Sequence, residues 1–153
     1  MSKGNCPFCN QKLRELSFCE SNSFLAIYNK APILPGHSMI IPKRHISSFI
    51  KLDAELRYEM IELSVKAIKM LQKTFPSKSF NWTIQEGVEA GQTINHLHMH
   101  IIPRTENDLP EPGDWYPNLE RNYKNLIIDS ELRPQYSDEE LLKIVKKIKQ
   151  LNS

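Results

Sequence analysis

Three of the five histidines in this 153-residue chain, His96, His98 and His100, stand at alternate positions of one short segment. Side chains of a β-strand alternate between its two faces, so we expect the three imidazoles to share one face while the apolar residues between them enter the core. Such a cluster could hold a metal ion, or one imidazole could attack a substrate as a nucleophile. A purely structural role would require a separate polar partner for every ring.

The spacing of the three histidines favours the nucleophilic role. Neighbouring side chains on one face of a strand lie ~6.5–7 Å apart, so all three would have to lean toward a single ion. A neutral imidazole, with a reference pKa of about 6.5, is largely unprotonated at pH 7 and can attack phosphorus directly. Two of the three rings could still share an ion, so metal binding stays open as an alternative.

A second pattern is the pair Cys6 and Cys9 in the tetrapeptide Cys-Pro-Phe-Cys. The two-residue spacer is typical of a zinc knuckle, which needs about two further ligands. Free surface thiols and a redox pair are the alternatives. A thioredoxin-like redox motif would require a strand before it and a helix after it, and the polar residues 1–12 offer neither. Three cysteines are also too few for a disulfide scaffold.

Alternating apolar and polar residues predict the strands that must position these side chains. The first alternating segment contains a polar turn and therefore predicts a hairpin. Proline follows or ends the later segments, because it cannot donate to a strand ladder. The predicted strand segments are 13–28, 38–41, 80–85 and 94–102.

Two helices are predicted from three- and four-residue apolar spacing. The long one covers 53–75, with Asp53 as N-cap and Pro76 just beyond its end. The second covers 137–152 and opens with a capping box at Ser137. Short connections and alternating strands together predict an α+β fold: an antiparallel sheet of about five strands with one long helix and a C-terminal helix.

Length and composition predict a single domain over residues 1–153, with a zinc-knuckle segment at 1–12 and a long loop at 105–136. The net charge of +2 is too mild to indicate a nucleic-acid partner. No apolar run approaches the ~20 residues that cross a bilayer, and the first residues lack the apolar stretch of a secretion signal. We therefore expect a cytoplasmic protein that binds neither a membrane nor a nucleic acid.

The run HLHMHII from His96 to Ile102 resembles the signature of the histidine-triad superfamily of nucleotidyl hydrolases and transferases. The preceding run QEGVEAGQT from Gln85 to Thr93 and the following Pro103-Arg104 resemble its fragile-histidine-triad branch, which cleaves diadenosine polyphosphates. The upstream runs FLAIYNK, PGH and IP also match, so the resemblance covers roughly residues 23–104. A histidine-triad fold is thereby expected.

The resemblance implies a hydrolase that cleaves dinucleoside polyphosphates at the α-phosphate and releases a nucleoside monophosphate. His98 would be the nucleophile and would carry a nucleotidyl-histidine intermediate. His100 would contact the phosphate and assist proton movement, and His37 would support the triad from below. The other implied site residues are Gln85 for the phosphate or leaving group, Gln92 and Thr93 for the phosphate, Asn29 for the ribose, and Phe24 and Ile27 for the base pocket.

The resemblance also bears on metal and assembly. Zinc-containing relatives in the superfamily pair such cysteines with a histidine at the place of His45 and with the first triad histidine. This implies a structural zinc site of Cys6, Cys9, His45 and His96, with no metal required for catalysis. His96 is then either a ligand or an active-site residue. Family members are usually homodimers joined through the long helix and an extended sheet, so a homodimer is expected here.

Two other functions are compatible with the sequence. The fragile-histidine-triad pattern lacks the cysteine pair, so the chain also resembles a zinc-bearing bacterial group of broader substrate range, and a nucleoside phosphoramidase or nucleotide-conjugate hydrolase is the second candidate. The nucleotide-binding, phosphoramidase-like branch of the superfamily often carries serine after the glutamine, where this chain has Thr93. A non-catalytic nucleotide-binding or interaction module is the third candidate, and an intact His98 beside Gln85 speaks against it.

Overall fold

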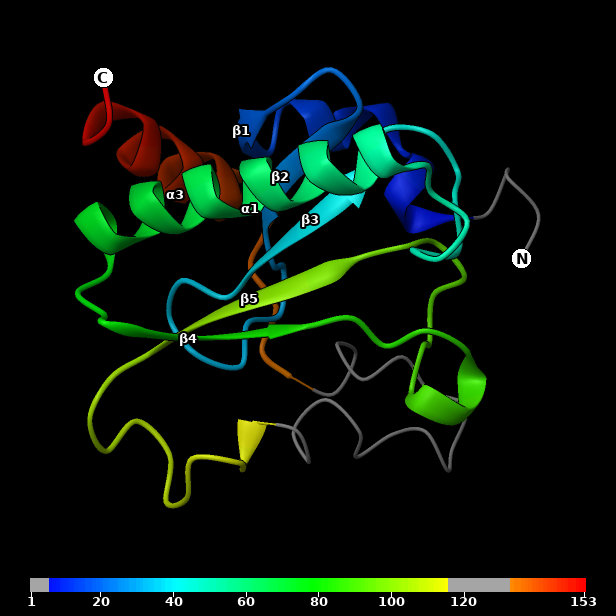
Figure 1. The fold of residues 1–153 in the computed structure, drawn as a ribbon. Coiled ribbons are helices and arrows are strands. Elements are labelled where there is room, and N and C mark those ends of the chain that lie inside the picture. Colours follow the sequence, from blue (N-terminus) through cyan, green and yellow to red (C-terminus); the bar gives the residue numbers. More distant parts are fainter. Residues whose placement is uncertain (1–5, 116–132) are drawn as a thin grey trace.

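The structure, a computed structural model, describes residues 6–115 and 133–153 (Figure 1). Its five strands form one antiparallel sheet in the order β1-β2-β3-β5-β4. The strands are β1 (Ser17–Glu20), β2 (Phe24–Tyr28), β3 (Ser38–Pro42), β4 (Ser79–Thr83) and β5 (Met99–Arg104). The α-helices are α1 (Ala54–Thr74) and α3 (Asp138–Gln150), and the short 3-10 helices are η2 (Pro7–Cys9), η3 (Gln11–Arg14) and η4 (Val88–Ala90). The predicted fold class is confirmed.

Both α-helices begin where their caps were predicted. The Asp53 side chain accepts a hydrogen bond of 2.8 Å from the backbone N–H of Leu56. Ser137 and Glu140 form the reciprocal capping box at the start of α3. These side chains satisfy backbone donors that the first helical turn leaves without partners, so the sequence alone locates both helix starts.

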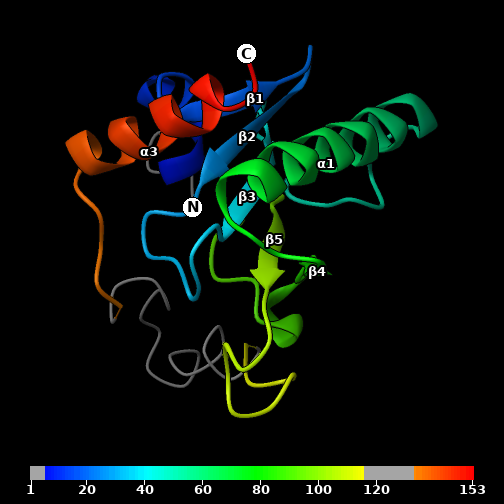
Figure 2. The ribbon, with the colours of Figure 1, turned by 90° about the vertical axis from the view of Figure 1, so that its left-hand side faces the viewer.

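The two helices pack on one face of the sheet and against each other (Figure 1). Figure 2 shows the same arrangement after a quarter turn, with α1 and α3 lying side by side on that face. Phe24, Ala26 and Tyr28 of β2 point toward the helices and belong to the main core. Leu25 and Ile27 point the opposite way and belong to a second, smaller apolar cluster. This alternation follows from the period of two residues along a strand.

The strand predicted at 94–102 is wrong at both ends. β5 begins only at Met99, because the backbone N–H of Leu97 bonds the carbonyl of Ile46 at 2.6 Å instead of joining the sheet. The strand also continues through Pro103, which pairs with β4 after the pairing with β3 has ended at Ile101. Proline is tolerated at a position with a neighbouring strand on only one side.

The long loop predicted at 105–136 lies partly outside the described residues. Its first part is folded back on the sheet by Arg104, whose guanidinium makes two hydrogen bonds of 2.9 and 2.8 Å to the carboxylate of Asp108. Its last part returns to the sheet where the N–H of Tyr136 donates to the carbonyl of Lys30 at 2.9 Å. Within residues 6–115 and 133–153, no helix is long and apolar enough to cross a membrane.

Candidate active site and metal centre

A cavity of about 380 Å³ lies on the sheet face that carries Ile27, Met39 and His100. This face is turned away from the main core, and Phe8 and Leu13 of the N-terminal segment pack on its apolar cluster. The cavity is therefore formed between the sheet, the first residues of the described chain and the start of α3. Its walls combine apolar side chains with imidazoles, amides, hydroxyl groups and several charged side chains, and such a mixture of apolar surface and a few polar groups is usual for a small-molecule site.

Most of the residues predicted to contact a nucleotide meet in this cavity. They come from segments far apart in the sequence: the end of β2, the loop after β4, the turn before β5 and β5 itself. The predicted residues that line it are Ile27, Asn29, Gln85, Thr93, His98 and His100. His37 lies directly below, fully buried, and does not line the cavity.

A hydrogen-bond chain fixes the tautomers of two histidines. The backbone N–H of Ile33 donates to Nδ1 of His37 at 3.1 Å, so a neutral His37 carries its hydrogen on Nε2. That nitrogen lies 2.9 Å from Nδ1 of His100 and donates to it. His100 then carries its hydrogen on Nε2. These hydrogen bonds hold the His100 ring in place and leave its N–H donor at the cavity wall.

His98 is held in the complementary tautomer. Its Nδ1 lies 2.7 Å from the carbonyl oxygen of His96. A carbonyl can only accept, so Nδ1 of His98 carries the hydrogen and the lone pair resides on Nε2. The rings of His98 and His100 are 5.0 Å apart between centroids. The lone pair of the His98 ring therefore lies next to a ring that carries an N–H donor.

Burial keeps the histidines behind His98 neutral. Loss of solvation lowers the pKa of His37 to about 3, and the positive charge of Arg133 adds to the effect. The pKa of His100 also lies well below its usual value, chiefly because of burial and secondarily because of His98. Both rings are neutral at pH 7, as the tautomer chain requires.

Stability should therefore fall in mild acid. Between its folded pKa of about 3 and an unfolded value near 6.5, His37 binds a proton only when the chain unfolds. Unfolding is then favoured as the pH falls below about 6.5, by up to ~1.4 kcal/mol per pH unit for each such histidine. Urea titrations from pH 7 to 5 test this. For His37→Gln, the free energy of unfolding should fall less steeply with decreasing pH than for the wild type, because the contribution of one histidine is missing. Equal pH dependence of the two proteins would contradict the assignment.

Gln85 presents an unsatisfied polar atom to the cavity. Its side chain is only 8% exposed, and Oε1 is the one buried side-chain oxygen or nitrogen without a hydrogen-bond partner in the described part of the chain. A buried acceptor without a donor destabilises the folded protein by about 1–3 kcal/mol. A ligand that donates a hydrogen bond to Oε1 would recover that energy.

Two predicted contact residues lie elsewhere. Phe24 points into the main core under the helices, and it stands three positions from Ile27, so the two cannot share a face. The amide of Gln92 is occupied within the protein: Oε1 accepts from the N–H of Gly87 at 2.9 Å and Nε2 donates to the carbonyl of Ser47 at 3.2 Å. Gln92 shapes the turn around η4 rather than facing the cavity.

Sequence reasoning missed several cavity residues. Phe8 sits between the two cysteines, and its ring lies 5.3 Å from that of His98. Met39 is the cross-strand neighbour of His100, which alternation along β3 could have indicated. Arg133 lies near the end of the long loop predicted at 105–136, where no pattern in the sequence signals a role. Phe8 and Arg133 lie outside residues 23–104, which carry the family resemblance, and Met39 lies within that range but in none of the matching runs.

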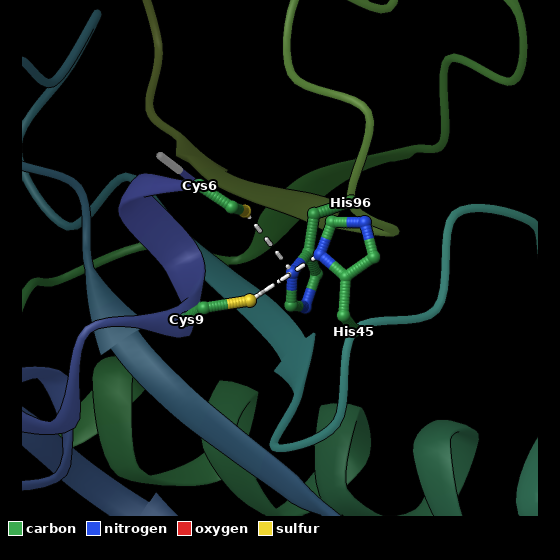
Figure 3. Close-up of side chains that lie close together, drawn as sticks. All are labelled: Cys6, Cys9, His45 and His96. Atoms are coloured by element: carbon green, nitrogen blue, oxygen red, sulfur yellow. Dashed lines mark hydrogen bonds between the residues drawn. The ribbon is translucent and has the colours of Figure 1, made fainter. Parts of the chain in front are cut away.

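The four predicted metal ligands come together in one cluster (Figure 3). One donor atom from each of Cys6, Cys9, His45 and His96 lies within 4.8 Å of the other three. Nδ1 of His96 is 3.4 Å from Sγ of Cys6 and 3.7 Å from Sγ of Cys9, and Nδ1 of His45 is 3.3 Å from Sγ of Cys9. Tetrahedral zinc, with Zn–S and Zn–N bonds of about 2.3 and 2.0–2.1 Å, implies sulfur–nitrogen distances of about 3.6 Å. The cluster can bind a metal ion.

His96 is prepared for this role. Its Nε2 lies 3.0 Å from the carbonyl oxygen of Pro42 and donates to it, so the lone pair of Nδ1 faces the two sulfur atoms. Its ring is fully buried and does not line the cavity. The first histidine of the triad therefore lies with the cysteines, and the other two line the cavity. Burial, with a secondary effect of His45, lowers the pKa of His96 to about 4, which keeps Nδ1 unprotonated.

Comparison with known proteins agrees with the fold. Over 101 residues the chain is 39% identical to bis(5'-nucleosyl)-tetraphosphatase (asymmetrical) of Schizosaccharomyces pombe, covering 66% of this chain and 56% of that relative. Over 131 residues it is 34% identical to bis(5'-adenosyl)-triphosphatase of Dictyostelium discoideum, covering 81% and 87%. The crystal structure of a hypothetical histidine triad nucleotide-binding protein from Sulfolobus tokodaii superimposes with a TM-score of 0.71 at 26% identity, covering 95% and 91%.

The family assignment follows from the extent of the match. The model of the HIT domain family matches residues 11–107, which include the whole sheet, α1 and the histidine cluster. The structure from Sulfolobus tokodaii is named as a histidine triad protein. The other two relatives are named as phosphatases of dinucleotides. The chain therefore belongs to the HIT domain family.

Proposed function

We propose that this protein hydrolyses dinucleoside polyphosphates at the α-phosphate and releases a nucleoside monophosphate. The observation that carries the proposal is the tautomer of His98, which places a nitrogen lone pair in the cavity next to an N–H of His100. The names of the relatives from Schizosaccharomyces pombe and Dictyostelium discoideum specify hydrolysis of such substrates. A nitrogen nucleophile in a nucleotide-sized cavity is what this reaction requires.

The reaction would proceed in two displacements. Nε2 of His98 attacks the α-phosphorus, a phosphorus–nitrogen bond forms, and the bond to the bridging oxygen of the polyphosphate breaks. The remainder leaves as ADP from diadenosine triphosphate or as ATP from diadenosine tetraphosphate. Water then attacks the same phosphorus, the phosphorus–nitrogen bond breaks, and AMP leaves with His98 regenerated.

His100 and His37 would serve the phosphate. The N–H of His100 can donate to a phosphate oxygen or to the bridging oxygen as charge develops there. His37 holds that N–H toward the cavity through the 2.9 Å contact. Because burial lowers the pKa of both rings, they act as neutral hydrogen-bonding groups in the resting enzyme.

The nucleoside would occupy the part of the cavity near Asn29 and Ile27. The Asn29 side chain is buried, and its Oδ1 already accepts from the N–H of Ala31 at 2.9 Å, which fixes the orientation of the amide. A fixed amide is suited to ribose hydroxyl groups. Ile27 offers an apolar surface to the base, and Gln85 and Thr93 offer polar groups near the phosphate.

A substrate panel tests the proposed function. The wild-type protein is incubated with diadenosine triphosphate, diadenosine tetraphosphate and adenosine 5'-phosphoramidate, and AMP release is followed by chromatography. Faster release from either dinucleotide supports the proposal. Preference for the phosphoramidate would favour the nucleotide-conjugate hydrolase, and binding without turnover of any of the three would favour the non-catalytic module.

We infer zinc as the metal of the cysteine–histidine cluster. Two thiolates and two imidazoles form a closed donor set that tetrahedral zinc prefers. Four protein ligands leave no position for substrate, so the ion would supply structural stability and take no part in the chemical step. Thiolates of this kind persist in a reducing compartment such as the cytoplasm, which is where we propose that the protein works.

A homodimer is proposed from exposed apolar side chains on α1 and β4. Tyr58 and Trp82 are 69% and 43% exposed, and β4 is an edge strand of the described sheet. Light scattering should give a mass of twice the 17.8 kDa of one chain. Tyr58→Glu with Trp82→Lys should yield monomers, whereas the control Leu142→Glu, at a 43% exposed position of α3, should not. A monomeric wild type would reject the proposal.

A further inference from the structure

The residues between the two cysteines form part of the wall of the cavity. Pro7 and Phe8 both line it. The ring of Phe8 contacts two members of the histidine cluster, with centroid distances of 5.3 Å to His98 and 5.7 Å to His96. The turn that bears the metal ligands therefore also touches the proposed nucleophile.

This turn is too small to hold its own position. η2 contains three residues, and no side chain caps its N-terminus. Sulfur–imidazole contacts of 3.3–3.7 Å join it to His45 and His96, and Phe8 packs on the apolar cluster of the sheet. A metal bound by Cys6 and Cys9 would convert these contacts into coordinate bonds, which fix the turn far more firmly than a thiol hydrogen bond does.

His96 makes a second connection from the metal centre to His98. Its ring faces the sulfur atoms, and its carbonyl oxygen accepts the Nδ1–H of His98 at 2.7 Å. Ligation on the side-chain end of His96 restrains the backbone that carries the carbonyl. That carbonyl sets both the tautomer and the direction of the His98 ring, and catalytic rates are sensitive to misplacement of a nucleophile by about 1 Å.

We propose that the metal centre positions the nucleophile and the nucleotide, in addition to stabilising the fold. Phe8 is a positioning residue that presses on His98, and His96 transmits ligation to the same ring through its carbonyl. Loss of the metal then loosens the cavity wall and the orientation of His98 while the sheet stays folded. The part of this inference that concerns nucleotide binding rests on the proposed function. The effect of the metal on the orientation of the His98 ring does not depend on that function.

The test compares metal-loaded wild type, metal-stripped wild type kept reduced, and the metal-loaded variants Phe8→Ala and Phe8→Tyr. Calorimetry measures the affinity for AMP, and ¹H–¹⁵N spectra of the imidazoles report the Nδ1–H tautomer of His98. Stripping should weaken AMP binding ~10-fold or more and broaden or shift the His98 signals, and added zinc should restore both. Circular dichroism checks that the stripped protein remains folded.

The Phe8 variants separate positioning from stability. Phe8→Ala should retain one metal per chain yet reproduce most of the loss in AMP affinity, and Phe8→Tyr, which keeps the ring, should recover affinity to within about twofold. If removal of the metal unfolds the sheet, the AMP affinity and His98 signals of the metal-loaded Phe8→Ala variant alone decide whether the inference holds. Unchanged AMP affinity and His98 signals in a folded stripped protein, or in Phe8→Ala, would overturn the inference. Failure of the loaded wild type to release AMP from the dinucleotides would instead refute the proposed function, and the imidazole spectra would still decide the inference.

Discussion

His98→Ala is expected to lower the rate of AMP release from diadenosine polyphosphates by at least ~10⁴-fold. The substitution removes the only nitrogen whose lone pair the carbonyl of His96 directs into the cavity. Without it, water would have to displace the leaving group directly. Initial rates of wild type and variant on the same substrate provide the measurement.

The controls for this prediction use the neighbouring ring. His100→Ala should lose activity by ~10²–10⁴-fold but still accept AMP on His98, because it removes a hydrogen-bond donor and not the nucleophile. Rapid acid quenching with labelled substrate should trap the adduct in wild type and in His100→Ala and not in His98→Ala. Equal AMP release by wild type and His98→Ala, or an adduct on another residue, would refute the assignment.

The double substitution Cys6→Ser with Cys9→Ser is expected to abolish metal binding and to destabilise the protein strongly. Two of the four donor atoms of the cluster disappear. When free metal exceeds its Kd ~1,000-fold, binding stabilises the folded state by about 4 kcal/mol, and that contribution would be lost. Elemental analysis of the purified protein and thermal unfolding with and without added zinc measure the two effects.

Cys19→Ala supplies the matched control for the double substitution. Cys19 is buried in β1 and belongs to the main core, away from the cluster. Its variant should keep about one metal per chain, and its unfolding temperature should still rise on addition of zinc. Unchanged metal content in the double variant would reject the site.

The sequence was most informative where a local rule has a direct structural counterpart. Asp53 and Ser137 cap the helices because their side chains reach N–H groups only three residues ahead. Alternation along β2 likewise separates its residues into two faces. Applied strictly, the same rule would have excluded Phe24 from the pocket once Ile27 was assigned to it.

Contacts between distant residues account for the errors. An alternating run around His98 predicts a strand, but the backbone before Met99 leaves the sheet because Leu97 bonds the loop at Ile46. Gln85 and Gln92 are equally plausible ligands for a phosphate in the sequence. The amide of Gln92 is not available to a ligand because it donates a hydrogen bond to the carbonyl of Ser47. The position of Ser47 cannot be predicted from the local sequence around Gln92.

The composition of the cavity wall constrains the order in which the protein becomes functional on the ribosome. Phe8 and Leu141 line the same cavity, although nearly the whole chain separates them. A nascent chain therefore lacks a complete binding site until α3 has emerged. Nucleotide can stabilise only molecules that possess the site, so it would favour the finished fold over earlier intermediates and leave the first stages of synthesis dependent on the sheet and α1.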